Sequence, residues 1–185
     1  MSVRQIVFSN DPMLHEASHR VRRIDEDVEA LIEDMIETMR AVDGIGLAAV
    51  QIGVPERVIV IKVPAVAEEG EEAEEPPQPE LYVLVNPEIV TASGHLVEGI
   101  EGCLSIPGWV GEVERHEAIV VRGLDREGRP VHVRAEGLLA RVFQHEIDHC
   151  QGTLFIDHID DPDKIWSVEE GREEEAEAGL EVLSG

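Results

Sequence analysis

The segment from residue 138 to residue 149 constrains this chain more than any other part of its sequence. Its apolar residues follow the three-and-four spacing of an amphipathic helix, with Leu138, Leu139, Val142, Phe143 and Ile147 on one face. Within it, His145 and His149 are four positions apart, so on a helix both imidazoles project from one side and can share a metal ion. Glu146 follows the first histidine, where a carboxylate can reach a metal-bound water and move its proton. The pattern predicts a metal-binding helix; a surface helix with two unrelated histidines is the alternative.

A catalytic metal needs a third protein ligand and an open position. His158 lies downstream and would complete a set of the zinc-protease type, but the preceding residues 152–156 are typical of an extended core segment. Cys103 lies upstream, after Gly102 and shortly before Pro107, which predicts a sharply turning backbone rather than a plain strand. A lone cysteine is otherwise most often a small buried apolar residue. The residues themselves leave the third ligand open between these two.

The rest of the chain predicts a second helix and several antiparallel strands. Residues 25–41 carry apolar side chains at helical spacing, and the helix should end at the glycines Gly44 and Gly46. Strands are expected at residues 57–63, 81–86, 88–92, 118–123 and 130–135, with a hairpin turn at 124–129. Residues 65–80 are rich in Glu and Pro and predict a solvated loop that joins two antiparallel strands. The order of elements predicts an α+β domain in which antiparallel sheets pack around a central metal-binding helix.

Length and charge narrow the setting of this domain. A chain of 185 residues suits one domain, which we place at residues 1–162, followed by an acidic tail or short helix at 163–185. The formal net charge of -25 with 43% apolar residues indicates a folded protein with a strongly acidic surface. Such a surface disfavours direct binding to nucleic acid or to an anionic membrane. No secretion signal or membrane-spanning run is visible, so we expect a cytoplasmic protein. Cys150 directly follows His149 and should point to a different helix face, so we expect it to be buried and not a ligand.

Three segments together resemble the signature motifs of the peptide deformylase family, in the order in which that family has them. They are GIGLAAVQ at residues 44–51, EGCLS at residues 101–105 and QHEIDH at residues 144–149. Weaker similarity extends over roughly residues 4–160. The resemblance implies a metallohydrolase that removes the formyl group from the N-terminal formylmethionine of new polypeptides and releases formate.

The resemblance also assigns the metal ligands and the catalytic groups. Cys103, His145 and His149 would bind one divalent ion, and a water in its fourth position would attack the formyl carbon, with Glu146 as general acid and base. Ferrous iron is the ion that the family generally prefers; zinc, nickel and cobalt are alternatives, and ligand spacing does not choose among them. The side-chain amide of Gln51 and the backbone N–H of Leu104 would donate to the oxyanion.

The substrate should bind beside this centre as an added strand. By resemblance, Ile45, Gly46 and Gly102 would line the cleft. Leu138 and Val142 are candidate walls of an apolar pocket for the methionine side chain, with ordinary helix core as their alternative. Asp148 is expected to anchor the metal helix by pairing with a cation such as Arg115, with solvent exposure as the alternative.

Partners and rival functions follow from the same residues. The expected partners are N-formylmethionyl peptides and, transiently, the ribosome, although an acidic tail argues against docking through a basic C-terminal helix. A zinc endopeptidase using His158 is the rival enzyme. A binding or structural domain that keeps a fully coordinated metal for stability is the rival from another class.

Overall fold

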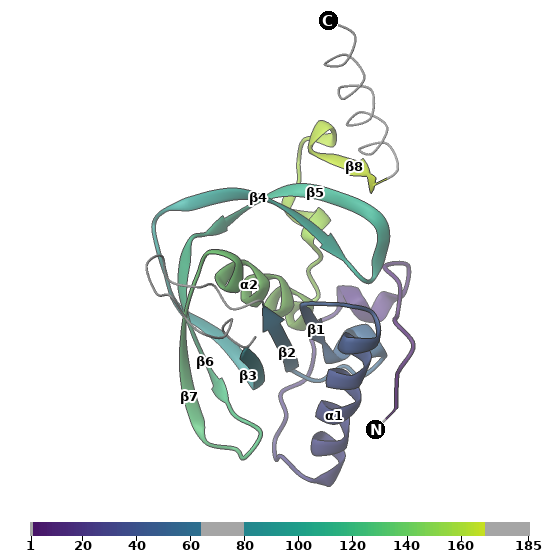
Figure 1. Cartoon of the computed structure of the whole chain (residues 1–185), viewed down its shortest axis with the longest axis vertical. Coiled ribbons are helices and arrows are strands. Elements are labelled where there is room, and N and C mark those ends of the chain that lie inside the picture. The colour runs from purple at the N-terminus through teal and green to yellow at the C-terminus, as the bar shows by residue number, and fades with distance from the viewer. Residues whose placement is uncertain (1, 64–79, 169–185) are drawn as a thin grey trace, which may run out of the picture.

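The computed structural model describes residues 2–63 and 80–168 of the chain. Two helices and two antiparallel sheets make up this part (Figure 1). The larger sheet has the strand order β1-β2-β3-β6-β7 and the smaller one the order β4-β5-β8. The expected loop at residues 65–80 lies outside the described residues apart from Glu80, which begins β3. Residues 169–185 of the expected tail also lie outside them.

The first helix, α1, spans Glu26–Ala41 and confirms the helix expected at residues 25–41. It begins because the Asp25 side chain accepts a hydrogen bond from the backbone N–H of Val28 and so caps the first turn. The apolar stripe of α1 is buried against one face of the large sheet. Val58 and Val60 of β2 (Val58–Val63) face α1, while Ile59 and Ile61 face the other side. A strand buried on both faces explains the continuous apolar run in this part of the sequence.

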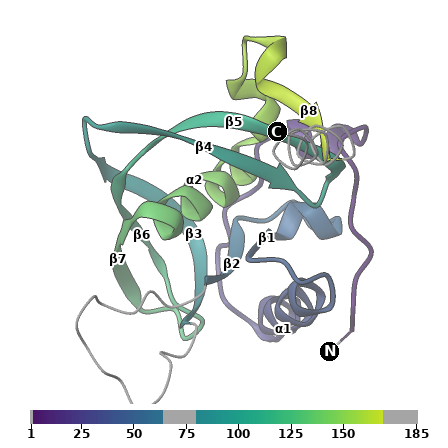
Figure 2. The same cartoon turned by 45° about the horizontal axis from the view of Figure 1, so that its top comes forward.

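The second helix, α2, spans Gly137–Gln151 and lies between the two sheets, as Figures 1 and 2 show. Phe143, Ile147 and Cys150 pack into the core beneath the large sheet, and Cys150 is buried as expected. The helix ends at Gly152, whose φ of 78° is a left-handed conformation that favours glycine. A side chain there would also meet the backbone of Glu16 at 2.7 Å. The expected arrangement of antiparallel sheets around a central helix is confirmed.

The strands match the expected ones in part. β2 pairs antiparallel with β3 (Glu80–Ala92), and β6 (Ala118–Leu124) pairs with β7 (Pro130–Glu136) through the expected hairpin. The two strands expected at 81–86 and 88–92 are one strand, β3. Its register shifts at residues 85–88, where Asn86 adopts a φ of 54° and the pairing changes from β2 to β6.

Four strands were not expected: β1 (Gly46–Ala48), β4 (Leu96–Cys103), β5 (Ile106–His116) and β8 (Ile165–Ser167). β8 pairs with β5, so residues 165–167 extend the small sheet beyond the domain boundary expected at residue 162. The expectation that residues 152–156 are extended was also wrong at its end, since Phe155–His158 is a 3-10 turn.

Candidate active site

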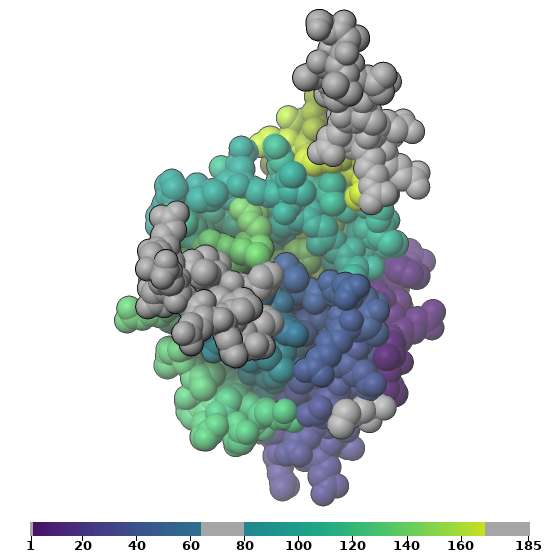
Figure 3. All heavy atoms as spheres, viewed as in Figure 1, coloured from purple at the N-terminus to yellow at the C-terminus, as the bar shows by residue number. Residues whose placement is uncertain are grey.

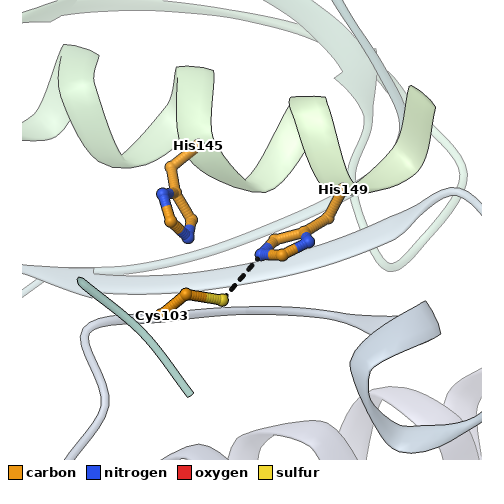
Figure 4. Close-up of side chains that lie close together, drawn as sticks. All are labelled: Cys103, His145 and His149. Atoms are coloured by element: carbon orange, nitrogen blue, oxygen red, sulfur yellow. Dashed lines mark hydrogen bonds between the residues drawn. The ribbon is translucent and has the colours of Figure 1, made fainter. Parts of the chain in front are cut away.

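Three side chains from two elements converge between α2 and the small sheet. Cys103 is the last residue of β4, and His145 and His149 come from one face of α2. Their ligand atoms all lie within 4.8 Å of one another, and Sγ of Cys103 is 3.3 Å from Nε2 of His149 (Figure 4). The pairing of β4 with β5 shifts register between Gly102 and Cys103, which confirms an irregular backbone here although Cys103 still belongs to a strand.

His158, the alternative third ligand, lies elsewhere. Its Nε2 atom is 2.8 Å from Oδ2 of Asp148 and 3.4 Å from Nη1 of Arg115. Within residues 2–63 and 80–168, the group that can hold a metal consists of Cys103, His145 and His149. The geometry therefore favours the upstream cysteine and argues against the zinc-endopeptidase alternative.

A buried acidic residue, Glu101, fixes the orientation of His145. Its Oε2 atom lies 3.0 Å from Nδ1 of His145, which leaves Nε2 to face the thiol. Arg115 of β5 donates to both Glu101 oxygens, at 2.9 and 3.0 Å, and to Oδ2 of Asp148 at 2.5 Å. The expected pairing of Asp148 with Arg115 is thus confirmed. One guanidinium joins the strand that carries Cys103 to the helix that carries the two histidines.

The electrostatics of these groups depend on burial and on their partners. Burial opposes charge on Glu101, but the hydrogen bond with His145 and the Arg115 guanidinium outweigh it and lower its pKa to about 2. Burial likewise opposes charge on His145, yet its contacts with Cys103 and Glu101 raise its pKa to about 10. Burial and the neighbouring His145 hold the pKa of His149 well below its usual range. A cation between these side chains would compete with a proton for the imidazole of His145.

Glu146 points into the same space from the next position of α2. The residue is 4% exposed, and its Oε2 atom is buried without a hydrogen-bond partner in the described part of the chain. Burial is the main reason that its pKa rises to about 7. Gly46 makes room for this carboxylate, because a Cβ there would lie 2.3 Å from Oε1. An unpaired buried carboxyl group with a pKa near neutrality suits proton transfer.

The side-chain amide of Gln51 lies next to the thiol of Cys103. The backbone N–H of Ala48 donates to its Oε1 at 2.8 Å, which turns Nε2 toward Sγ of Cys103 at 3.5 Å and Oγ of Ser105 at 3.3 Å. The amide group is thus held with its donor end toward the candidate metal ligands. Leu104, the next residue after Cys103, lines a cavity that lies between β4 and α2.

The structure brings the other predicted site residues to one cavity of about 460 Å³ between β4 and α2. Its lining includes Ile45, Gly46, Gly102, Leu138 and Val142, together with Gln51, Cys103, Leu104, His145 and Glu146. In Figure 3, atoms of α2 are visible between the small sheet and α1. Val142 is buried and forms an inner wall, whereas Leu138 is 49% exposed and lies at the rim. His149 is buried and is not among the described residues that line the cavity.

Two residues with evident roles were not predicted from the sequence. Glu101 was part of a motif but had no assigned role. The sequence feature that could have indicated its role is its place as an acidic residue two positions before Cys103. Arg141 lines the cavity and donates to Oε1 of Glu101 at 2.9 Å. Its signal is a spacing of four residues from His145, which places both on one helix face.

The donor set fits a metal ion. One thiol and two imidazoles lie close enough to reach a single ion, and Glu101 orients one imidazole as second-layer carboxylates do in metal sites. Three side chains that can hold a metal, two of which line a cavity, together with a buried carboxyl group beside them, are the features of a metal-dependent hydrolase.

The chain belongs to the polypeptide deformylase family, whose sequence model matches residues 3–165 of this chain. The peptide deformylase of Thermomicrobium roseum is 50% identical over 179 residues, which cover 96% of this chain and 98% of that protein. The peptide deformylase of Rhizobium meliloti is 48% identical over 86% of each chain. These findings confirm the resemblance of the three motifs and the assignment as a deformylase.

Solved structures support the same family. The crystal structure of peptide deformylase from Ehrlichia chaffeensis superposes with a TM-score of 0.78 at 40% identity, covering 86% of this chain and 89% of that one. A structure of the Ehrlichia protein in complex with actinonin gives a TM-score of 0.77 at 43% identity, covering 87% and 91%. None of the helices in residues 2–63 and 80–168 is long and apolar enough to cross a membrane.

Proposed function

We propose that the deformylase reaction of this chain takes place in the cavity between β4 and α2, with Cys103, His145 and His149 as the metal ligands. The observation that carries the proposal is the convergence of the three ligand atoms within 4.8 Å, beside the unpaired Oε2 of Glu146. When bound, a divalent ion would supply a Lewis acid and an activated water at its open position. Thiolate and imidazole donors suit several ions, and we propose ferrous iron in the cell, with zinc, nickel or cobalt as substitutes.

Glu146 is the proposed general base and acid. Its carboxylate takes a proton from the attacking water and delivers it to the amide nitrogen as the bond between formyl carbon and nitrogen breaks. Water adds to the formyl carbon, and the products are formate and a peptide with a free amino group. Glu146 lines the cavity, and its Oε2 atom has no hydrogen-bond partner among the described residues, which supports this role.

Gln51 and Leu104 are the proposed donors to the oxygen that becomes negatively charged. The Nε2 atom of Gln51 already faces the ligand side of the cavity, because Ala48 holds the other end of the amide group. A preorganised donor at such a position lowers the barrier by about 2.7–4 kcal/mol. The backbone N–H of Leu104 is assigned by its position directly after Cys103.

The cavity itself is the proposed binding site for the formylated end of the peptide. Ile45, Gly46 and Gly102 are proposed to line the path of its backbone, and Val142 and Leu138 the pocket for the methionine side chain. All five line the observed cavity.

The test is an anaerobic assay of formate release from formyl-Met-Ala-Ser by the iron-loaded protein. Glu146→Ala should retain the metal and lose activity by about 10²–10⁴-fold, because only proton transfer is removed. Cys103→Ala should lose both the metal and the activity. No formate from the wild-type protein would refute the assignment, and full activity of Glu146→Ala at wild-type metal content would refute the role of Glu146.

We also propose that one catalytic domain comprises about residues 1–162, extended by β8, and that the acidic residues after it do not support tight ribosome docking. Residues 163–185 contain eight Asp or Glu and two Lys or Arg in the sequence. The negative charges of these acidic residues repel the phosphate groups of ribosomal RNA. Tight cosedimentation with ribosomes that is lost when residues 169–185 are removed would contradict this expectation.

A further inference from the structure

Arg141 occupies an unusual place for a charged side chain, in the wall of the cavity one helical turn before His145. Its side chain is only 14% exposed. Nη1 donates to Oε1 of Glu101 at 2.9 Å and to the carbonyl oxygens of Val113 at 2.8 Å and Gly99 at 3.3 Å. Nη2 donates to the carbonyl oxygen of Val97 at 2.6 Å. The guanidinium is therefore held in place from two strands.

Gly99 of β4 explains how the guanidinium fits there. A Cβ on Gly99 would lie 2.8 Å from Cζ and Nη2 of Arg141 and 3.0 Å from Nε. The end of a free arginine would move aside at little cost, but this one is fixed by its hydrogen bonds to Glu101 and to the strand carbonyls. Arg141 thus lies against the part of β4 that has no side chain, and it forms part of the cavity wall.

We propose that Arg141, seated on Gly99, is a specificity-determining residue that sets the width of the pocket for the first side chain of the formylated peptide. The inference rests on the proposed function, since it places that side chain between Val142 and the stem of Arg141. A wall fixed by hydrogen bonds cannot yield to a wide group as a loosely packed apolar wall does. It should admit the slender, flexible and polarisable chain of methionine and exclude aromatic side chains.

Two substitutions should change the pocket in opposite directions. Arg141→Ala removes the wall, so kcat/KM for formyl-Phe-Ala-Ser should rise relative to formyl-Met-Ala-Ser, by about tenfold or more. Gly99→Ala should push the guanidinium toward the cavity and narrow it. For that variant, kcat/KM for formyl-Met-Ala-Ser should fall relative to formyl-Ala-Ala-Ser, by about tenfold.

The double variant and a matched glycine variant serve as controls. In Gly99→Ala/Arg141→Ala the added methyl group meets no guanidinium, so its substrate ratios should equal those of Arg141→Ala. Gly94→Ala lies in the connection between β3 and β4, where a Cβ would meet nothing within 4 Å, and its ratios should match the wild type. The metal content of every variant is measured, because Arg141 also contacts Glu101.

The outcomes separate this inference from the proposed function. A wild-type protein without formate release would refute the function, whereas an active wild type whose two single variants keep ratios within about twofold would overturn the role of Arg141 alone. If Arg141→Ala loses its metal, Gly99→Ala decides, because this substitution removes no charged group from the chain. A double variant that behaves like Gly99→Ala would also overturn the inference, since the effect of the methyl group would then not depend on the guanidinium.

Discussion

At the scale of single residues, the tightest constraint on the proposed site is the contact between Gly46 and Glu146. A methyl group on Gly46 would lie 2.3 Å from Oε1 of Glu146 and 2.9 Å from Cγ1 of Val142, so the carboxylate must move. We expect Gly46→Ala to lower kcat by about 10²-fold, because small displacements of a catalytic group have effects of that size. Steady-state kinetics with formyl-Met-Ala-Ser measures the change.

Gly44 is the matched control for this prediction. It lies two positions away in the same loop, and a Cβ there would make ordinary contacts of 3.4–3.6 Å with Leu104, Met39 and the backbone of Gly46. Gly44→Ala should keep kcat near the wild-type value. Equal losses in both variants would indicate a general disturbance of the loop instead of a displaced Glu146.

The sequence predicted the three side chains that converge at the proposed metal site, but not the residues that hold them in place. His145 and His149 were found because their spacing matches one helical turn, and Cys103 and Gln51 because their surrounding residues resemble family motifs. Glu101 and Arg141 have roles that depend on a contact between β4 and α2, 40 positions apart in the sequence. Such a contact leaves no periodic pattern, so only the structure shows it.

At the scale of elements, the small sheet was missed because few of its inner positions are apolar; Val113 is the buried apolar residue of β5. Along β4, the residues that face α2 include Gly99 under Arg141 and Glu101 beside His145. In a sequence, a half-buried strand is normally recognised by apolar residues at alternate positions. Here glycine and a buried carboxylate stand where those residues would be, because the strand faces a cavity and a metal site. α1, α2 and β2 were predicted well because each buries ordinary apolar side chains.

Arg115 is expected to be the main electrostatic link between these elements. Its side chain is 6% exposed and pairs with Glu101 of β4 and Asp148 of α2. Arg115→Met would leave two carboxylates without this partner in a buried setting, so the free energy of unfolding should fall by about 3–5 kcal/mol. Urea titrations with a chelator present measure this fall without the contribution of bound metal.

Arg122 provides the comparison at the surface of the large sheet. It pairs with Glu88 at 2.6 Å, but its side chain is 55% exposed. Arg122→Met should change the free energy of unfolding by less than about 1 kcal/mol. Losses of similar size in the two arginine variants would contradict a special role for the buried pair.

At the scale of the whole molecule, the acidic surface should make stability depend on salt. The formal net charge of the whole chain is -25, so the acidic groups repel one another, and unfolding relieves that repulsion by spreading the charges apart. Added salt screens charges separated by more than about 10 Å at 0.1 M, so it removes much of this penalty while leaving the short buried pairs of Arg115 nearly intact.

The thermal midpoint of the metal-free protein should therefore rise between low salt and about 0.5 M NaCl at pH 7. Near pH 5, carboxyl groups with ordinary pKa values begin to bind protons, so the same addition of salt should raise the midpoint less. Differential scanning calorimetry at both pH values measures the two increments, and a midpoint at pH 7 that is unchanged or lowered by salt would show that self-repulsion does not limit the stability of this fold.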